Sequence, residues 1–190
     1  MPDLDPTLGV RRLTRRSVLA LGVTSAGLLL ARTPAEGAVV ISVGELSFTV
    51  PDTIRPVPAA SATSLGRGWQ WSGRGEPPGP DDRTAPVVLA RADLASVDPQ
   101  EITGLLLANA AAGLLPGLEL GANRVRSMPG GGDQTRIDLA YAVAPSLPFH
   151  GTMLIATRPE PPAAVLVMVG SDALTAGVID GVLDSARWGS

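Results

Sequence analysis

From residue 38 onward, apolar and polar residues alternate in short runs that are typical of β-strands. The run Leu46-Ser47-Phe48-Thr49-Val50 shows the period of two that places one side chain in a core and the next in solvent. Comparable runs predict further strands at residues 39–43, 68–71, 87–91, 122–127, 135–143, 151–157 and 164–169. In the run 135–143 one face carries Ile137, Leu139 and Tyr141, and the other carries Arg136, Asp138 and Ala140.

A first helix is predicted to begin at Pro99, a residue suited to the first helical position because it has no N–H to leave unpaired. Asp98 and Glu101 have the spacing of a capping box, in which each side chain accepts from the backbone amide of the other. We expect this helix to run to residue 114 or 115, where Pro116-Gly117 ends it.

A second helix is predicted over residues 172–187, with Ser171 as its cap and Arg187 in its last turn. Gly177 and Gly181 lie four residues apart, which predicts close packing of this helix against a sheet. Its apolar stripe consists of Leu174, Val178, Ile179, Val182, Leu183 and Ala186.

The order of these elements predicts the fold class. Short connections between the last four strands favour an antiparallel meander, because a parallel pair needs a long crossover. We therefore expect an α+β domain over residues 38–190, with an antiparallel sheet of about six to eight strands and two main helices packed on it. Residues 72–86 are rich in glycine, proline and charge, and they predict a flexible loop.

Two segments resemble the PsbP-like fold of photosystem II extrinsic proteins and of small secreted or lipid-anchored actinobacterial proteins. They are the opening run LSFTVPD at 46–52 and the closing run VLDSAR at 182–187. Between them only the order of elements matches, and Thr53-Ile54 stands where that family often has Gly-Trp. The resemblance implies an α/β/α sandwich and brings no catalytic motif.

Residues 1–37 have the order of an export signal: a basic cluster, an apolar run and then small residues. The pattern of a bacterial twin-arginine (Tat) signal is matched by Thr14, Arg15, Arg16, Val18 and Leu19. Ala35 and Gly37 occupy the two small positions before the expected cleavage site. We therefore predict a leader and a cleaved Tat-type signal peptide, with the Tat translocase as a transient partner; an ordinary secretion signal is the alternative.

The composition excludes some locations and some classes of partner. The chain contains no Cys, so a lipid-anchored lipoprotein and disulfide bonds are excluded. All 15 basic residues are Arg, and abundant Ala, Gly and Pro indicate a GC-rich, actinobacterial genome. After residue 37 there remain 10 Arg and 15 acidic residues, a formal charge of −5, which argues against nucleic-acid binding and against adsorption to anionic lipid. We expect a secreted or cell-envelope protein with no stable membrane span after cleavage.

No catalytic constellation is present in the sequence. There is no Gly-x-Ser-x-Gly motif and no Lys, and the one histidine, His150, falls in a segment with two prolines that predicts a loop. A zinc site needs three or four His, Cys or acidic ligands, and Glu76, Asp81 and Asp82 lack the spacing of an EF-hand. We therefore predict no metal and no cofactor.

These observations favour an exported non-catalytic module that binds a protein, an envelope component or a small apolar ligand. Its binding surface would use the loop 72–86 and the loops of the meander. Trp69 and Trp71, expected on one face of a short strand, are candidate binding residues, with core packing as the alternative. Two other functions stay open: a carboxylate-based extracytoplasmic hydrolase with two acids facing across a cleft, and the same module tethered by an uncleaved signal segment.

Overall fold

The structure is a computed structural model that describes residues 37–58, 65, 68–112 and 115–189. The Tat-pattern residues and Ala35 lie outside the described residues, and Gly37 is the first residue inside them. No helix within the described ranges is long and apolar enough to cross a membrane.

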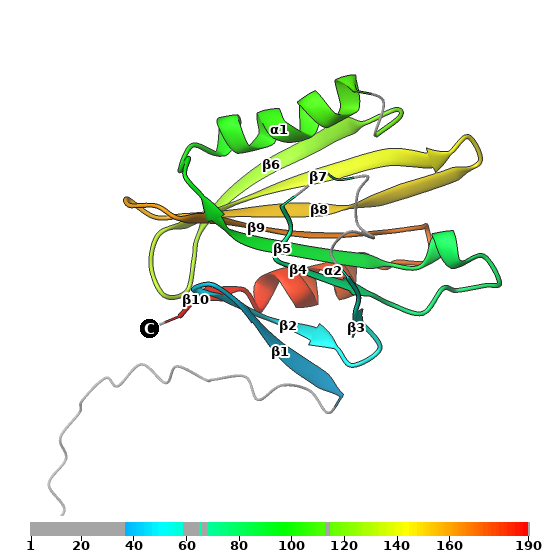
Figure 1. The fold of residues 1–190 in the computed structure, drawn as a ribbon, viewed down its shortest axis with the longest axis horizontal. Helices are drawn as coiled ribbons and strands as arrows, with labels where there is room; N and C mark the ends of the chain where they lie inside the picture. Colours follow the sequence, from blue (N-terminus) through cyan, green and yellow to red (C-terminus); the bar gives the residue numbers. More distant parts are fainter. Residues whose placement is uncertain (1–36, 59–64, 66–67, 113–114, 190) are drawn as a thin grey trace, which may run out of the picture. The chain divides into compact units, whose positions relative to one another are not determined.

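Seven antiparallel strands form the central sheet in the order β3-β4-β5-β9-β8-β7-β6 (Figure 1). Consecutive strands from β6 to β9 pair as neighbours, so the predicted meander is confirmed. The bounds of the seven strands are β3 Arg55–Pro56, β4 Trp71–Arg74, β5 Val87–Leu94, β6 Glu119–Ser127, β7 Asp133–Ala144, β8 Leu147–Thr157 and β9 Ala163–Gly170.

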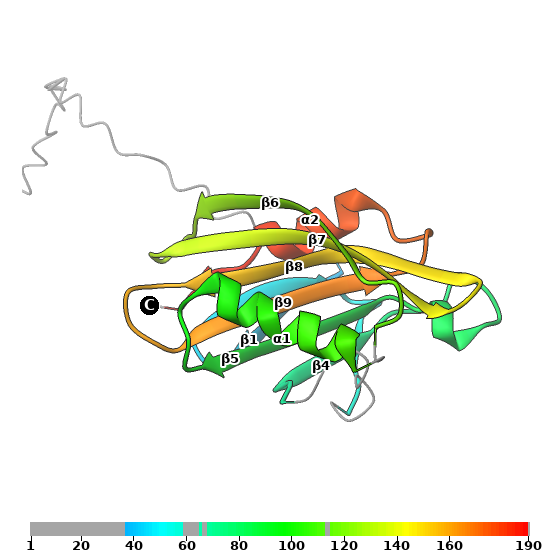
Figure 2. The ribbon, with the colours of Figure 1, turned by 90° about the horizontal axis from the view of Figure 1, so that it is seen from above.

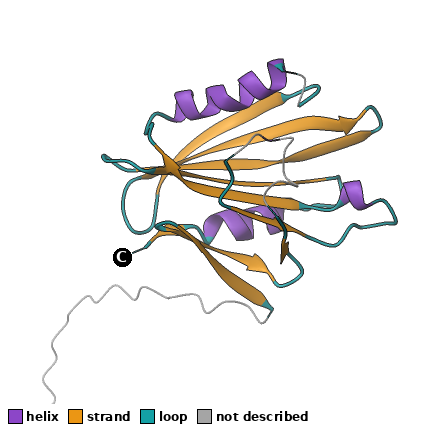
Figure 3. Ribbon diagram, in the orientation of Figure 1, coloured by secondary structure: helices purple, strands orange, loops and turns teal. Residues whose placement is uncertain are grey.

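A second, smaller sheet and two helices complete the fold. The small sheet has the order β1-β2-β10, with β1 at Ala38–Val43, β2 at Leu46–Pro51 and β10 at Arg187–Trp188. Helix α1 (Pro99–Ala111) lies over one face of the central sheet, whereas α2 (Ala176–Asp184) and the small sheet lie against the other (Figures 1, 2 and 3). The predicted fold class is confirmed: an α+β sandwich with antiparallel sheets and two main helices.

Strand β9 separates two hydrophobic cores. It is buried at all eight positions, and its side chains alternate between the two faces of the sheet. Val165 and Val167 belong to the core on the α1 side, whereas Leu166 and Met168 belong to the core beneath α2 and the small sheet. The sequence of a strand that is covered on both faces is a continuous apolar run. This explains why residues 163–169 include no polar residue.

The start of α1 is predicted correctly, but the capping box is wrong. Asp98 Oδ1 accepts from the backbone N–H of Gln100 at 2.8 Å rather than from that of Glu101. The N–H of Asp98 donates to Ser96 Oγ at 3.1 Å, so Ser96 takes the role expected of Glu101. The predicted end of the helix falls next to residues 113–114, which are not described.

Helix α2 begins one turn later than predicted, after Thr175. Ser171 closes a turn instead, in which its carbonyl accepts from Leu174 N at 2.8 Å. The predicted helix also ends too late, because Arg187 pairs with Ser47 in β10. Apart from Val178, which is 39% exposed, the predicted apolar stripe is buried.

The two glycines of α2 do not serve close packing. A Cβ built on Gly177 or on Gly181 would meet nothing within 4 Å, and both residues are exposed. The prediction that they bring α2 close to the sheet is therefore wrong. The helix is held instead by its larger side chains and by Arg136, as described below.

The predicted loop 72–86 starts with three residues of β4, which pair with Val87–Leu89 of β5. Near its other end Asp81 caps a short 3-10 helix at Asp82–Thr84, accepting from the N–H of Arg83 at 2.9 Å. The loop is therefore shorter than predicted, because both of its ends belong to regular structure. The flexibility of the segment between them stays a prediction.

Candidate functional site

Trp69 and Trp71 lie on opposite sides of the central sheet, so the prediction that both indoles share one face is wrong. Trp71 packs edge-on against Phe48, with ring centroids 5.5 Å apart, in the core beneath the small sheet. Trp69 packs against the core on the α1 side. The regular strand begins only at Trp71, and the chain bends at Gln70, so the period of two does not apply to this pair. Both indoles are half-buried, as the core-packing alternative expects.

An apolar pocket of about 300 Å³ lies on the α1 side of the sheet, between the β7–β8 hairpin and the segment 74–85. Both of these segments were predicted to form the binding surface. The pocket is lined by Val57, Pro58, Leu65, Arg74, Arg83, Ala85, Val87, Leu89, Tyr141, Val143, Phe149 and Val169.

Four strands build the wall of this pocket. Tyr141 of β7 and Phe149 of β8 are directly opposite in the register, and their rings lie 5.9 Å apart at an angle of 44°. Leu89 of β5 and Val169 of β9 add fully buried aliphatic side chains. Regular strands therefore position all four side chains of the apolar wall.

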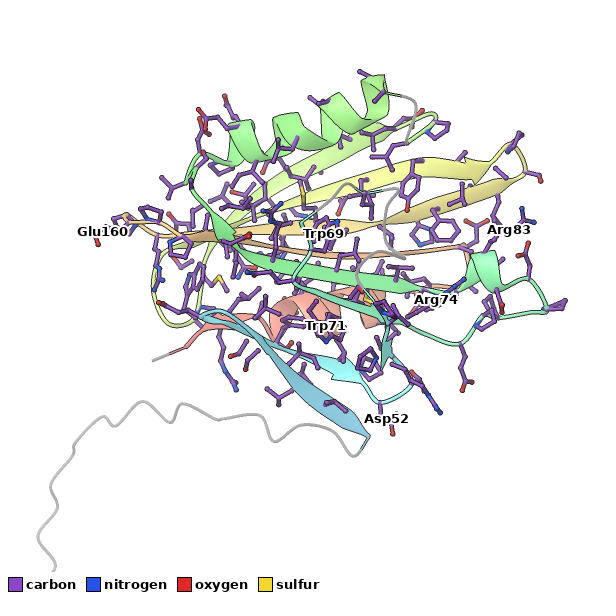
Figure 4. The ribbon with its side chains drawn as sticks, viewed as in Figure 1. Asp52, Trp69, Trp71, Arg74, Arg83 and Glu160 are labelled. Carbon is purple, nitrogen blue, oxygen red and sulfur yellow. The ribbon has the colours of Figure 1, made fainter. Side chains whose placement is uncertain are left out.

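Two arginines form the polar rim of the pocket, and Figure 4 places both near the 3-10 helix. Arg83 forms an ion pair with Asp81, with 2.8 Å between Arg83 Nη2 and Asp81 Oδ2. The side-chain hydrogen bond from Arg83 holds the pKa of Asp81 below its ordinary value of 3.8. Arg74 Nη2 donates to the backbone carbonyl of Asp82, a neutral partner. The positive charge of Arg74 is therefore not offset by its hydrogen-bond partner.

A larger groove of about 490 Å³, with an ion pair at its centre, lies on the opposite face of the same strands, beside α2. At its centre Asp138 Oδ1 accepts from Arg124 Nη2 at 2.6 Å and from Thr152 Oγ1 at 2.9 Å. The residues that line the groove are Glu119, Leu120, Gly121, Arg124, Asp138, Leu139, Ala140, His150, Gly151, Thr152, Ala176, Ile179 and Asp180.

His150 lies in strand β8, so the prediction of a loop at this position is wrong. Its Nε2 is 2.9 Å from the carbonyl oxygen of Leu174, which fits an Nε2–H donor. Its Nδ1 is 3.8 Å from a carboxylate oxygen of Asp172. The histidine thus connects the sheet to the turn that precedes α2, at the rim of the groove.

The hydrolase alternative requires two acids that face each other across a cleft. The groove contains three acidic residues, Glu119, Asp138 and Asp180, and the last two are in ion pairs. Asp138 is paired with Arg124, and Asp180 lies 3.8 Å from Arg136. The two carboxylate side chains are 41% and 56% exposed. A carboxyl that acts as a general acid is typically kept protonated by apolar burial. No group of three metal-ligating side chains occurs within the described ranges.

Arg136 is a charged residue whose role the sequence pattern did not reveal. Its side chain is 4% exposed and lies between β7 and α2. Its guanidinium is 2.7 Å from Asp184 and 3.8 Å from Asp180, and its Nε donates to Gln134 Oε1 at 2.9 Å. Asp180 and Asp184 are four residues apart on the helix, a spacing that places two carboxylates over one cation. That spacing is the only signal in the sequence that points to this contact.

The fold has known structural counterparts, although no protein-family model and no curated protein sequence matches the chain. The cyanobacterial PsbP protein (CyanoP) of Synechocystis sp. PCC 6803 is similar with a TM-score of 0.54 and 14% identity, over 87% of this chain and 98% of its own. LpqN of Mycobacterium tuberculosis, described as involved in cell envelope biogenesis, is similar with a TM-score of 0.52 and 15% identity, over 80% and 91%. These likenesses show a PsbP-like fold.

Proposed function

We propose that the protein is a non-catalytic binding module whose ligand is a small amphiphile with an anionic end. The apolar pocket carries this proposal, because rings and aliphatic side chains line it and arginines are the only charged residues in its described lining. Ligand sites commonly combine an apolar wall with a few polar groups that fix the orientation of the ligand. The groove beside α2 also has apolar surface, but the one arginine in its described lining, Arg124, is already paired with Asp138.

The size and the rim of the pocket specify the ligand further. A volume of about 300 Å³ is at the lower end of the range for ligand sites, so it suits a single short chain better than a two-chain lipid. Arg83 is already paired with Asp81, whereas Arg74 has only a carbonyl partner among the described contacts. We therefore assign the anionic end of the ligand to Arg74.

The proposed place of action is outside the cytoplasmic membrane, after export through the Tat pathway and removal of the signal behind Gly37. The pattern at residues 14–19 supports this proposal, as does the fold shared with an envelope-biogenesis protein. Replacing both arginines (Arg15→Lys with Arg16→Lys) should leave the precursor in the cytoplasm, measured by cell fractionation. Undiminished export of the double variant would contradict the Tat assignment.

Binding is tested by calorimetric titration of the purified protein with decanoate. A ligand of this size in a preformed apolar site should bind with a dissociation constant on the order of 100 µM. Val143→Trp places a large ring at the rim of the pocket, where Val143 is 41% exposed, and should weaken binding at least about tenfold. Val125→Trp is the matched control, since Val125 is an exposed valine that does not line the pocket. Equal affinities of the two variants would overturn the pocket assignment.

The role of Arg74 is tested with two ligands that differ in charge. Arg74→Gln should lower the affinity for decanoate about fivefold and leave the affinity for the neutral decan-1-ol unchanged, because only the carboxylate contacts the guanidinium. Arg187→Gln is the control, an exposed arginine that does not line the pocket. If Arg74→Gln lowers the affinity for both ligands equally, the residue shapes the pocket and does not recognise charge.

A further inference from the structure

The two edges of the central sheet differ in length and in protection. Strand β3, at one edge, has only two residues, and Pro56 has no N–H to donate. Strand β6, at the other edge, has nine residues, and all of them except Leu120 are exposed. Figure 2 shows β6 along the margin of the sheet, beyond α1. A long edge strand of this kind presents a row of N–H and C=O groups to which another strand can pair.

The side chains of β6 give this edge a charge and a pattern. Arg124 and Arg126 are two residues apart and therefore share one face, while Val125, 65% exposed, points to the other. Arg124 contacts Asp138 through a pair in which both side chains are more than 40% exposed. Arg126 forms no ion pair with any described residue. The edge thus presents two arginines at alternate positions, Arg124 in an exposed ion pair and Arg126 without an ion pair to a described residue, with an apolar side chain between them.

We propose that β6 accepts an extended protein segment that adds to the sheet as a further strand and carries acidic side chains at alternate positions. Backbone hydrogen bonds along β6 would hold the segment, as in other cases of strand addition. Two carboxylates at alternate positions fall beside Arg124 and Arg126, where opposite charges on neighbouring strands attract. An apolar residue between them meets Val125 on the other face.

A second copy of this chain fits the edge less well than an acidic segment. In a two-fold antiparallel pairing centred on Val125, Arg124 of one copy would lie opposite Arg126 of the other, and like charges directly opposite are unfavourable. Charged edges commonly prevent such self-association. The same two arginines that oppose self-pairing attract a segment of the opposite charge, so the edge is selective.

The proposal is tested by NMR titration of the purified, ¹⁵N-labelled protein with the capped peptide TEVEVET and with its charge-reversed control TKVKVKT. TEVEVET should shift the amides of residues 121–127 and protect them from hydrogen exchange, whereas TKVKVKT should not. Arg126→Glu should lower the affinity for TEVEVET about tenfold, and Arg126→Gln should lower it about threefold. Arg187→Glu, an exposed arginine in another sheet, should leave the affinity unchanged.

Four results would overturn the proposal. They are no saturable binding of TEVEVET, equal binding of TKVKVKT, shifts that map to the edge strand β1 instead, and protection of residues 121–127 that grows with protein concentration when no peptide is present. The last result would assign the edge to a second copy of the chain.

Discussion

The apolar pocket and the groove beside α2 are built from neighbouring residues of the same two strands. Tyr141 and Phe149, paired across β7 and β8, face the pocket, and the next pair, Ala140 and His150, faces the groove. The difference follows from the period of two, which sends successive side chains to opposite faces. The groove is the larger hollow, yet the charges at its centre already neutralise one another, whereas Arg74 at the rim of the pocket hydrogen-bonds only a neutral carbonyl among the described contacts. Volume alone therefore does not identify the better ligand site.

The largest expected loss of stability comes from a mutation on the pocket side of the sheet. Phe149→Ala should lower the free energy of unfolding by about 3–4 kcal/mol, because it removes a ring that is 4% exposed and leaves a cavity. Thr152→Ala, the matched change on the groove side of β8, removes one hydrogen bond to Asp138 and should cost about 1 kcal/mol. Urea denaturation measures both values. Equal losses would show that the two faces do not differ in the way described.

The two arginine contacts of the groove face should differ in strength. Arg136→Ala should cost about 2–3 kcal/mol, since this side chain is buried between β7 and α2. Both of its aspartate partners are more than half exposed and stay hydrated after the change, which limits the loss. Arg124→Ala breaks an exposed pair and should cost less than about 1 kcal/mol. A ranking in the opposite order, again by urea denaturation, would contradict the assigned burial.

The glycines of α2 offer a gain in stability instead of a loss. Gly181→Ala should raise the free energy of unfolding by about 0.5–1 kcal/mol, because the added methyl meets nothing within 4 Å and alanine favours the helix. Gly151→Ala in β8 is the opposite case, since its Cβ would clash with the Met168 carbonyl oxygen, and it should destabilise the protein. Thermal denaturation distinguishes the two. A destabilising Gly181→Ala would mean that α2 packs closely at this position after all.

The smallest expected effect on stability is the protonation of Asp81, beside the rim of the pocket, at acid pH. The pKa of Asp81 is lower in the folded protein than its ordinary value of 3.8, so its contribution to stability is present above that pH and is lost as the pH falls through the lower folded value. A carboxyl ¹³C titration by NMR should therefore find a midpoint below 3.8, and Arg83→Gln should return it toward 3.8. An unchanged midpoint in that variant would show that Arg83 is not the cause.

Much of the fold was predictable from local patterns. Alternation identified the strands, and short connections identified the antiparallel meander. The errors occurred where a tertiary contact overrides a local pattern. Two prolines around His150 indicated a loop, yet Pro148 pairs with Ala142 within the hairpin. Residues 171–187 had the period of one helix, yet the chain closes a turn at Ser171 and reaches β2 through β10.

For the candidate site, the sequence predicted the two segments that line it but not the residues that form its wall. The sequence pointed to the loop 72–86 and to the meander loops, and both line the pocket. The pairing of Tyr141 with Phe149 depends on the register of β7 and β8, which the sequence does not specify once the segment before residue 151 is taken as a loop. Trp69 and Trp71 were the visible aromatic candidates, but they fill the two cores instead.

Methyl NMR during a decanoate titration distinguishes a ligand in the apolar pocket from a ligand in the groove. A ligand in the pocket should give saturable shifts for Leu89, Val143 and Val169, which line the pocket, and none for Ala176 and Ile179, which line the groove. Saturable shifts confined to Ala176 and Ile179, or no saturable shifts at all, would contradict the pocket assignment.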